Sequence, residues 1–267
     1  MTRFSLQEDG VALVTGAAGA IGGACVESFA AAGARVALVD VAALSERMDQ
    51  VLADVQSRHP EAEGSVHACD VADAGDVARL AAEIDDRWGR LDYLALVAGI
   101  IHDARPVESV PIEDWDRVLG VNLRGPFLLT RELVPIMRRR ESGSIVAIGS
   151  WYGRLGHAYF GPYCASKAGL IVLTQVLAAE LAPAGIRANT VSPGNVDTPM
   201  HHKALVDEAA ERGVSYEEMR DIEWEKIPLG RPSPTEDIAN AVLFLCSDAS
   251  SSITGSSIDV NGGVLFR

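Results

Sequence analysis

The chain has few cysteines, and none of them are paired. Its 267 residues contain Cys25, Cys69, Cys164 and Cys246, which are scattered without a recurring spacing. This scatter predicts reduced thiols or small buried side chains, and it argues against a disulfide framework and against a zinc site. The start of the chain shows no basic segment followed by an apolar leader, and we expect no bilayer-spanning run. A cytoplasmic location is therefore expected.

Basic residues are also scarce, because 23 Lys and Arg stand against 37 Asp and Glu, a formal net charge of -14 at pH 7. An acidic protein is repelled by nucleic-acid phosphates, so we expect no nucleic-acid partner, and we also expect no membrane partner. Hydrophobic residues make up 48% of the chain, which is enough for one core. Internal repeats, low-complexity linkers and composition breaks are not found, which predicts one domain over residues 1–267.

A glycine-rich turn follows the first predicted strand, at residues 11–15. The turn, GAAGAIGG at residues 16–23, opens a helix, with Gly16 suited to a tight turn and Gly22 to close packing of helix on strand. Such a turn lets the backbone and the free N–H groups of a helix approach a pyrophosphate. The next predicted strand ends in Asp40, whose carboxylate can accept hydrogen bonds from both hydroxyls of an adenosine ribose. The alternative for Asp40 is a cap or turn role, but the strand–turn–helix–strand–acid order favours the ribose.

The remaining chain alternates predicted strands with predicted helices. Further strands are expected at residues 65–69, 92–97, 144–150, 187–192 and 257–260. Helices are expected at residues 42–58, 74–88, 113–140 with a break near 124–126, from about 160 onward, and at 235–247. Residues 199–227 are polar and irregular in pattern. Repeated βα alternation predicts the α/β class: a doubly wound, Rossmann-like parallel sheet of about seven strands with helices on both faces.

A tyrosine and a lysine stand four residues apart where a long apolar helix is expected to begin. Tyr163 and Lys167 then share one helix face, one turn apart. A fixed ammonium favours a phenolate, so we expect it to lower the pKa of Tyr163 and to provide a proton donor and acceptor near neutral pH. Ser150 ends the preceding predicted strand and brings a second hydroxyl. The pair alone is typical of a solvated helix face, but this helix is too apolar to be solvated.

These segments together resemble the short-chain dehydrogenase/reductase family over nearly the whole chain. Order and spacing agree as well as residue type in the segments TGAAGAIG at 15–22, Asp70-Val71, Ala98-Gly99, Val121-Asn122-Leu123, Ser150, Tyr163-x-x-x-Lys167 and PGNVDT at 193–198. The resemblance implies an NAD-dependent enzyme that acts on a CH–OH group. It also implies a catalytic group made of Asn122, Ser150, Tyr163 and Lys167.

The resemblance further implies which residues hold the cofactor, with Asp70 and Val71 at the adenine and with Val196 and Thr198 near the nicotinamide. The implied set is Gly16, Gly19, Ala20, Ile21, Gly22, Asp40, Asp70, Val71, Val97, Ala98, Gly99, Tyr163, Lys167, Pro193, Gly194, Val196 and Thr198. One departure is Leu96-Val97, where the family usually has two asparagines that tie neighbouring strands and touch the cofactor. Only a backbone contact to the cofactor is expected there. The other departure is Ala20 in place of the commoner glycine.

Aromatic, histidine and other side chains near the catalytic segments are expected to line a substrate pocket. The predicted lining is His102, Trp151, Tyr152, His157, Tyr159, Asn195 and Met200, with Phe160, His201 and Trp224 nearby. The alternative for each is core or interface packing. The adjacent histidines at 201 and 202 lack a third ligand close by, so no metal is expected. Residues 199–227 resemble the family's variable substrate lid, with a solvated face formed by Glu217, Glu218, Glu223 and Glu225.

The predicted reaction is hydride transfer between NAD(H) and a secondary alcohol or ketone, with Tyr163 as general acid and base. Ser150 is expected to bond the reacting oxygen, Lys167 to hold the nicotinamide ribose, and Asn122 to position a water or to serve only as a helix-kink residue. One alternative is an NADPH-dependent reductase of 3-oxoacyl type, which Asp40 disfavours. Another is a cofactor-binding regulator without catalysis. Sugars, polyols, cyclic alcohols and hydroxy acids all remain open as substrates.

Two apolar helices predict the assembly. The helix after Tyr163 is apolar around much of its circumference, so it requires another packing partner besides the sheet. Its apolar residues are Leu170, Ile171, Val172, Leu173, Val176, Leu177 and Leu181. The helix before the fifth strand is expected to behave alike through Phe127, Leu128, Leu129, Leu133 and Ile136. Pairing of these helices about a two-fold axis, with a second contact through the tail 258–267 as in tetramers of the resembled family, predicts a homotetramer.

Overall fold

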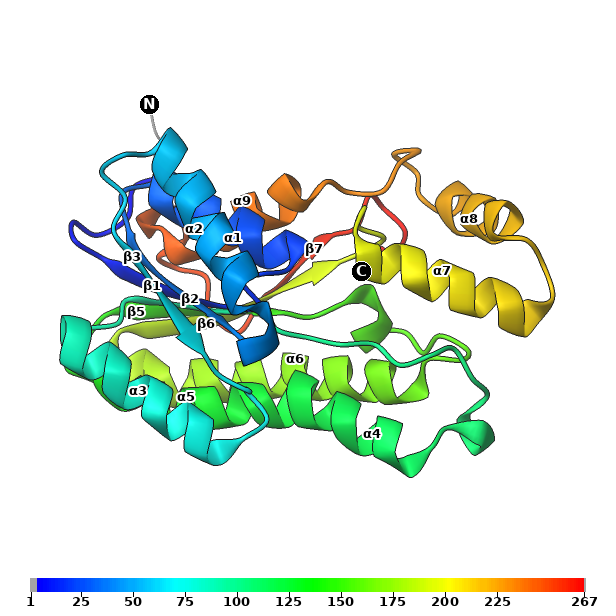
Figure 1. Cartoon of the computed structure of the whole chain (residues 1–267), viewed down its shortest axis with the longest axis horizontal. Coiled ribbons are helices and arrows are strands. Elements are labelled where there is room, and N and C mark those ends of the chain that lie inside the picture. Colours follow the sequence, from blue (N-terminus) through cyan, green and yellow to red (C-terminus); the bar gives the residue numbers. More distant parts are fainter. Residues whose placement is uncertain (1–3, 267) are drawn as a thin grey trace.

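A parallel sheet forms the centre of the computed structural model, which describes residues 4–266 (Figure 1). Residues 1–3 and 267, at the ends of the predicted domain and tail, lie outside the described residues. Within the described part the sheet has seven strands in the order β3-β2-β1-β4-β5-β6-β7, which confirms the predicted fold. The strands are β1 (Val11–Thr15), β2 (Arg35–Asp40), β3 (Gly64–Ala68), β4 (Tyr93–Leu96), β5 (Gly143–Ile148), β6 (Ile186–Pro193) and β7 (Ser257–Val260).

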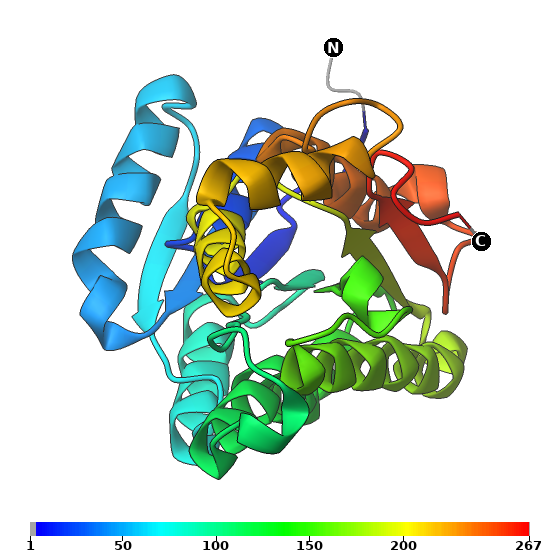
Figure 2. The same cartoon turned by 90° about the vertical axis from the view of Figure 1, so that its right-hand side faces the viewer.

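Helices cover both faces of the sheet (Figure 1). One face carries α1 (Ala20–Ala31), α2 (Ser45–Arg58) and α9 (Thr235–Cys246), and the other carries α3 (Ala74–Trp88), α4 (Ile112–Leu119), α5 (Gly125–Arg138) and α6 (Gly161–Leu181). The helices α7 (Pro199–Arg212) and α8 (Tyr216–Glu225) extend past the end of the sheet (Figure 1), and Figure 2 shows α8 crossing in front of the sheet. Short 3₁₀ turns lie at 42–44, 107–109, 151–153, 182–184 and 248–250.

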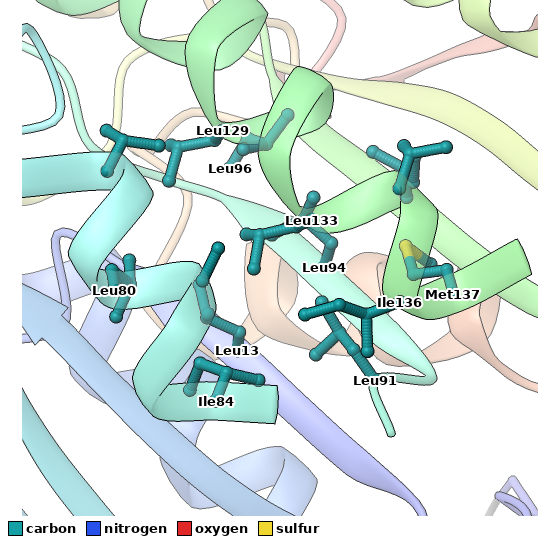
Figure 3. Close-up of a cluster of buried hydrophobic side chains, with 14 of the residues drawn as sticks. Leu13, Leu80, Ile84, Leu91, Leu94, Leu96, Leu129, Leu133, Ile136 and Met137 are labelled. Atoms are coloured by element: carbon teal, nitrogen blue, oxygen red, sulfur yellow. The ribbon is translucent and has the colours of Figure 1, made fainter. Parts of the chain in front are cut away.

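The sheet separates two apolar cores because successive side chains of a strand point to opposite faces. In β1, Val11 and Leu13 join one core, whereas Ala12 and Val14 join the other. Figure 3 shows the first core, in which α3 and α5 bury a leucine-rich layer against the strands: Leu13, Leu80, Ile84, Leu91, Leu94, Leu96, Leu129, Leu133, Ile136 and Met137. Burial on both faces explains why the strands have continuous apolar sequences.

The turn between β1 and α1 needs its glycines for close approach. Gly16 has φ +66°, and a Cβ atom there would lie 2.9 Å from the Cα of Ala98. A Cβ atom on Gly22 would lie 2.0 Å from the carbonyl oxygen of Gly16. No side chain fits at either position, so the backbone of α1 packs directly on the turn and the turn on the end of β4.

The predicted break in the helix over 113–140 is wrong. Residues Gly120–Arg124 form a π-helical turn that joins α4 to α5 without interruption. Pro126 follows at once, in the first turn of α5. A proline lacks an N–H group, and the wider turn before it already displaces the hydrogen-bond pattern, so the helix continues at little cost.

The segment 199–227, expected to be irregular, is mostly helical. Thr198 Oγ1 caps α7 by accepting from His201 N at 3.3 Å, and Ser215 Oγ caps α8 by accepting from Glu218 N at 3.1 Å. Gly213, with φ +68°, ends α7. These capping residues begin and end two helices that the polar composition of the segment did not reveal. The expected solvated position of Glu223 is also wrong, because its exposed fraction is 1%.

Helix α6 corrects the expectation that the chain has no apolar run of membrane length. The helical stretch Gly161–Ala184 is long enough to cross a bilayer, and its best window has a mean hydropathy of 1.4. In this fold it is a core helix that packs on β6. Its buried residues recur every three or four positions, at Lys167, Leu170, Thr174, Ala178 and Leu181. Length and composition alone do not separate such a helix from a membrane span.

Candidate active site

The predicted catalytic and cofactor residues gather at the carboxyl ends of β1, β2, β4, β5 and β6. The strand order reverses between β1 and β4, so their following loops diverge and leave a crevice where ligands bind in open α/β sheets. The glycine turn follows β1 and Gly99 follows β4, on the two sides of this point. A Cβ atom on Gly99 would lie 3.3 Å from Lys167 Nζ, which places the crevice beside that lysine.

The glycine turn and Asp40 fit a dinucleotide. Gly19 precedes α1 without a side-chain cap, and the first turn of α1 holds no acid, so its N–H groups are available to a phosphate. Asp40 Oδ2 accepts from Ala18 N at 3.1 Å, and its Oδ1 accepts from Val41 N at 2.9 Å. Each carboxylate oxygen keeps a lone pair for a ribose hydroxyl. Ala20 and Ile21 continue the same turn into α1.

A threonine does the tying that the family's usual asparagines perform. Buried Thr15 Oγ1 accepts from Val97 N at 3.0 Å and from Ala98 N at 3.1 Å, and it donates to Ala95 O at 3.4 Å. These bonds join the end of β1 to the loop after β4. The backbone after β4 is therefore fixed although the side chains of Leu96 and Val97 have no amide group.

The other residues of the implied cofactor set lie on neighbouring loops. Asp70 is exposed after β3 and accepts from Ala72 N at 2.9 Å, whereas Val71 is buried. Pro193 ends β6, and a Cβ atom on Gly194 would lie 2.8 Å from Asn261 Cα, which requires a glycine. Val196 is buried and Thr198 caps α7, which places both where β6 leads into α7.

The structure brings Ser150, Tyr163 and Lys167 together. Ser150 lies two residues past β5, not at its end as expected, and it is near enough to Tyr163 to lower the pKa of that phenol in part. It also accepts from Tyr152 N at 3.1 Å. Lys167 Nζ lies 5.6 Å from the centre of the Tyr163 ring and donates to Ile148 O at 2.8 Å. A lysine ammonium has three donors, so two remain for a ligand.

Burial controls the electrostatics of this group. It raises the pKa of Tyr163 to about 12, and the hydrogen bond from Ser150 lowers this pKa in part. Lys167 is not among the influences on the tyrosine, so the expected lowering of its pKa by the ammonium is not what this structure shows. Burial lowers the pKa of Lys167 to about 8. Both shifts disfavour the charged form, as expected for ionisable groups surrounded by protein.

Asn122 lies within the π-helical turn and is fully buried. Its Oδ1 accepts from Ile100 N at 2.8 Å, and its Nδ2 donates to Ile100 O at 2.9 Å and to Ser166 Oγ at 3.1 Å. The amide thereby joins the loop after β4 to α6, one residue before Lys167. This bonding pattern agrees with a residue that stabilises a distorted helix, and such π turns are frequent at functional sites.

An aromatic cluster adjoins the catalytic tyrosine. Tyr152 meets Tyr163 edge-on, with ring centres 6.1 Å apart, and stacks on His157 at 4.3 Å. Trp151 contacts both Tyr152 and His157. Phe160, which is 0% exposed, contacts Tyr152 and His157 as well. Three predicted lining residues therefore pack together on one side of the site, and Phe160 supports two of them, Tyr152 and His157.

The other predicted lining residues are less directly placed. Buried His102 packs edge-on against Phe160, and neither of its ring nitrogens has a partner. Tyr159 has a left-handed backbone, φ +71°, and its ring packs under the guanidinium of Arg212 at 5.3 Å. Asn195 is buried, whereas Met200 is exposed in the first turn of α7. The structure does not bring Tyr159 or Met200 into contact with Tyr163.

The helices α7 and α8 are joined to each other by polar contacts. His202 bridges Tyr216 at 2.7 Å and Asp197 at 2.8 Å, and Trp224 Nε1 donates to His201 Nε2 at 3.3 Å. The two adjacent histidines therefore have protein partners and point to different ones. Burial lowers the pKa of His201 to about 4, so it accepts from Trp224 in its neutral form.

Sequence reasoning missed two features of the site. Thr15 stands directly before the glycine turn, and a hydroxyl between a strand and a tight turn is the signal that could have identified it. Glu208 and Glu223 are 2% and 1% exposed, although both belong to polar helices. Their burial depends on how α7 and α8 pack, which no local pattern reveals.

Comparisons with known proteins agree over nearly the whole chain. A family model described as enoyl-(acyl carrier protein) reductase matches residues 16–265. The chain is 38% identical to the 3-oxoacyl-[acyl-carrier-protein] reductase FabG of Thermotoga maritima, covering 97% of this chain and 99% of that protein. It is 37% identical to the D-threitol dehydrogenase of Mycolicibacterium smegmatis, covering 99% and 96%. The structure of NAD⁺-bound xylitol dehydrogenase superposes with a TM-score of 0.90 at 29% identity, covering 96% and 99%.

The buried ammonium of Lys167 predicts a pH-dependent stability. Its pKa is about 8 in the folded protein against an ordinary value of 10.5, so the unfolded chain binds more protons between these values. Stability relative to a Lys167→Met variant should therefore rise from about pH 8 to pH 10, by on the order of 1–3 kcal/mol, and stay level below pH 8, where the lysine is protonated in both states. Urea unfolding at several pH values measures it.

The control is Lys203→Met, which removes a lysine whose side chain is 51% exposed. The difference between the wild type and this variant should not rise over the same pH range. Parallel pH profiles for the wild type and Lys167→Met would show that the buried lysine does not titrate as described.

Proposed function

Since the chain belongs to the short-chain dehydrogenase/reductase family, we propose that it transfers a hydride between NAD(H) and a secondary alcohol or its ketone. The family places it among the oxidoreductases that act on an alcohol or ketone with a nicotinamide cofactor. The observation that carries the proposal is the group formed by Ser150, Tyr163 and Lys167 beside a glycine turn. Residues 4–266 are proposed to form one catalytic domain, with a substrate lid at 199–227.

In the proposed reaction, Tyr163 moves the proton. The bound nicotinamide cofactor supplies the carbon that accepts or donates the hydride. During oxidation the phenolic oxygen takes the proton of the alcohol hydroxyl, and during reduction it returns a proton to the carbonyl oxygen. Ser150, close to Tyr163, is placed to bond the same reacting oxygen. Lys167 has two donors left beside Ile148 O, and these suit the hydroxyls of the nicotinamide ribose.

The preference for NAD(H) rests on Asp40. Its carboxylate is fixed at the end of β2 by two backbone N–H groups, one of them in the glycine turn. A carboxylate there accepts from a ribose 2′-hydroxyl and repels a 2′-phosphate. The glycine turn itself, residues 16–23, contains no lysine or arginine that would offset this repulsion.

A second candidate is a ketone reductase for 3-oxoacyl thioesters that uses NADPH. The observation in its favour is the 38% identity to the FabG protein of Thermotoga maritima. The carboxylate of Asp40 disfavours this candidate, because it would repel the 2′-phosphate of NADPH. The similarity to the D-threitol dehydrogenase is nearly as high and favours an alcohol dehydrogenase.

We propose a homotetramer because apolar side chains remain uncovered on α5 and α6. Phe127, Val172 and Val176 are 48%, 58% and 46% exposed. Beside them lies a hollow of about 520 Å³, lined by Leu119, Leu123, Phe127 and Leu173 among others. The expected contribution of α5 is smaller than predicted, because Leu128, Leu129, Leu133 and Ile136 belong to the core. Phe266, 79% exposed, suits the second contact through the tail.

Removing the hydroxyl of Tyr163 should abolish most turnover. In Tyr163→Phe we expect kcat to fall by roughly 10²–10⁴-fold, because the proton-transfer group is lost, while NADH binding and folding stay nearly unchanged. Turnover of a panel of secondary alcohols and ketones, followed by NADH absorbance, measures this. Tyr93→Phe is the control, since its hydroxyl bonds Gln7 and lies away from the site. Near-normal activity of Tyr163→Phe would refute the proposed role.

Cofactor choice should depend on Asp40. The wild type should prefer NAD⁺ over NADP⁺ by on the order of 10²-fold in kcat/KM, and Asp40→Ala combined with Val41→Arg should reduce or reverse that preference. Asp49→Ala removes an exposed acid of α2 and should leave the preference unchanged. Equal use of both cofactors by the wild type would contradict the role of Asp40.

Light scattering at micromolar concentration should give the mass of four chains. A glutamate at the exposed apolar face, Val172→Glu, should reduce that mass, because a desolvated charge opposes the contact. Val206→Glu changes a similarly exposed valine on α7, with 52% exposure, and should leave the mass unchanged. A stable monomer of the wild type would end the tetramer proposal.

A further inference from the structure

Two buried carboxylates of the lid meet a histidine of the catalytic loop. Glu208 on α7 and Glu223 on α8 are 2% and 1% exposed. His157 lies between Ser150 and Tyr163 in the sequence. Each of the three residues brings one ligand atom to within 4.8 Å of the other two. Charged side chains are rarely buried so completely unless they have partners, so the partners decide what this group can bind.

The charges of the two carboxylates are already balanced from the outer side. Arg212 Nη2 lies 2.6 Å from Glu208 Oε1, and Lys226 Nζ is paired with Glu223 Oε1. Both cations are themselves partly exposed, with 36% and 43% of their side chains accessible. The two carboxylates and the two cations together carry no net charge, so the group does not attract a metal ion by its charge.

One carboxylate oxygen of the group lacks a hydrogen-bond donor. Glu223 Oε2 is buried and has no hydrogen-bond partner. His157 Nδ1 lies 3.0 Å from Ala158 O, which can only accept, so that ring nitrogen carries a hydrogen. His157 Nε2 lies 3.9 Å from Glu223 Oε1, which is too long for a hydrogen bond. A buried acceptor without a donor costs free energy, so this arrangement is completed by a donor from elsewhere.

Ring contacts connect this group to the reaction site. Tyr152 stacks on His157, with an angle of 16° between the rings, and it also meets the ring of Tyr163 edge-on. Asn195, in the loop after β6, donates from Nδ2 to the backbone oxygen of Glu223 at 3.4 Å. The unpaired carboxylate oxygen thus belongs to the part of the lid that is tied to the active-site loops.

We propose that the missing donor is a hydroxyl group of the substrate, distant from the hydroxyl that reacts. The enzyme would then act on a polyhydroxylated alcohol or its ketone, with Glu223 as the main acceptor and His157 and Glu208 beside it. This inference rests on the proposed function. Ligand atoms within 4.8 Å of one another let one oxygen lie about 2.7–3.0 Å from each of them.

A divalent cation fits the same group less well. It needs carboxylate oxygens that are free to coordinate, whereas Glu208 Oε1 and Glu223 Oε1 are already paired with Arg212 and Lys226. It would also add two charges to a buried group that Arg212 and Lys226 already neutralise. A neutral hydroxyl meets neither obstacle, since it donates to Glu223 and leaves the outer ion pairs in place.

The test compares two alcohols with the same four-carbon chain. D-Threitol carries hydroxyls on every carbon, whereas 2-butanol carries only a reacting secondary hydroxyl. In Glu223→Gln we expect kcat/KM for D-threitol to fall by on the order of tenfold or more, and kcat/KM for 2-butanol to change by less than about threefold. Glu225→Gln, an exposed acid two residues further along α8, is the control and should change neither value. NADH binding verifies that each variant is folded.

The possible outcomes separate this inference from the proposed function. Equal losses with both alcohols, or turnover of 2-butanol with none of D-threitol, overturn the hydroxyl subsite and leave the proposed function intact. Loss of D-threitol oxidation on treatment with EDTA, restored by Mg²⁺ or Mn²⁺, makes the group a cation site and also overturns the inference. No turnover of either alcohol or of the wider panel rejects the proposed function and this inference with it.

Discussion

The close approach of the glycine turn to the end of β4 is the contact on which the site depends. A side chain at Gly16 would overlap the backbone at Ala98, and one at Gly22 would overlap the carbonyl of Gly16. Because both spaces are filled by backbone, α1 begins directly above β1, with its N–H groups facing the crevice. The hydroxyl of Thr15 then fixes the loop after β4 to the same point. A phosphate-binding helix end and the loop beside Lys167 are thus held at one place by contacts of a few atoms.

The same packing explains the electrostatics of the catalytic group. Tyr163 and Lys167 are both surrounded by protein, and burial moves their pKa values apart, to about 12 for the phenol and about 8 for the ammonium. The ammonium donates to Ile148 O and lies 5.6 Å from the centre of the Tyr163 ring, and Ser150 is the side chain that lowers the pKa of the phenol. An isolated pair of these side chains would be governed by the attraction between the ammonium and the phenolate, which is the effect expected from the sequence. In the folded protein desolvation is larger, and the pair is arranged to be completed by ligands that carry hydroxyls.

Local patterns predicted the parts of the fold that are determined locally. The bounds of β1 and α3 match the expected residues, because β1 is a short apolar run and α3 is an amphipathic run ended by a glycine. The gathering of Asn122, Ser150, Tyr163 and Lys167 followed from motif order and strand direction. The π turn at 120–124 was not predictable, since its sequence is compatible with an ordinary helix. The burial of Glu223 was not predictable either, because it depends on packing between α8 and loops distant in the sequence.

The lid differs from the rest of the molecule in what holds it. Its own apolar cluster is small, with Leu205, Ala209 and Met219 as the buried members. Its ties to the body are polar and mostly near the surface, such as Lys203 to Asp103 at 2.7 Å and His202 to Asp197 at 2.8 Å. Exposed ion pairs contribute little stability, so α7 and α8 can separate from the body at a small cost in free energy, whereas the sheet cannot. In the substrate lid proposed here, such a segment would open to admit a ligand and would close when buried acceptors such as Glu223 Oε2 find their donors, so the contacts that select the ligand would also complete the closed state.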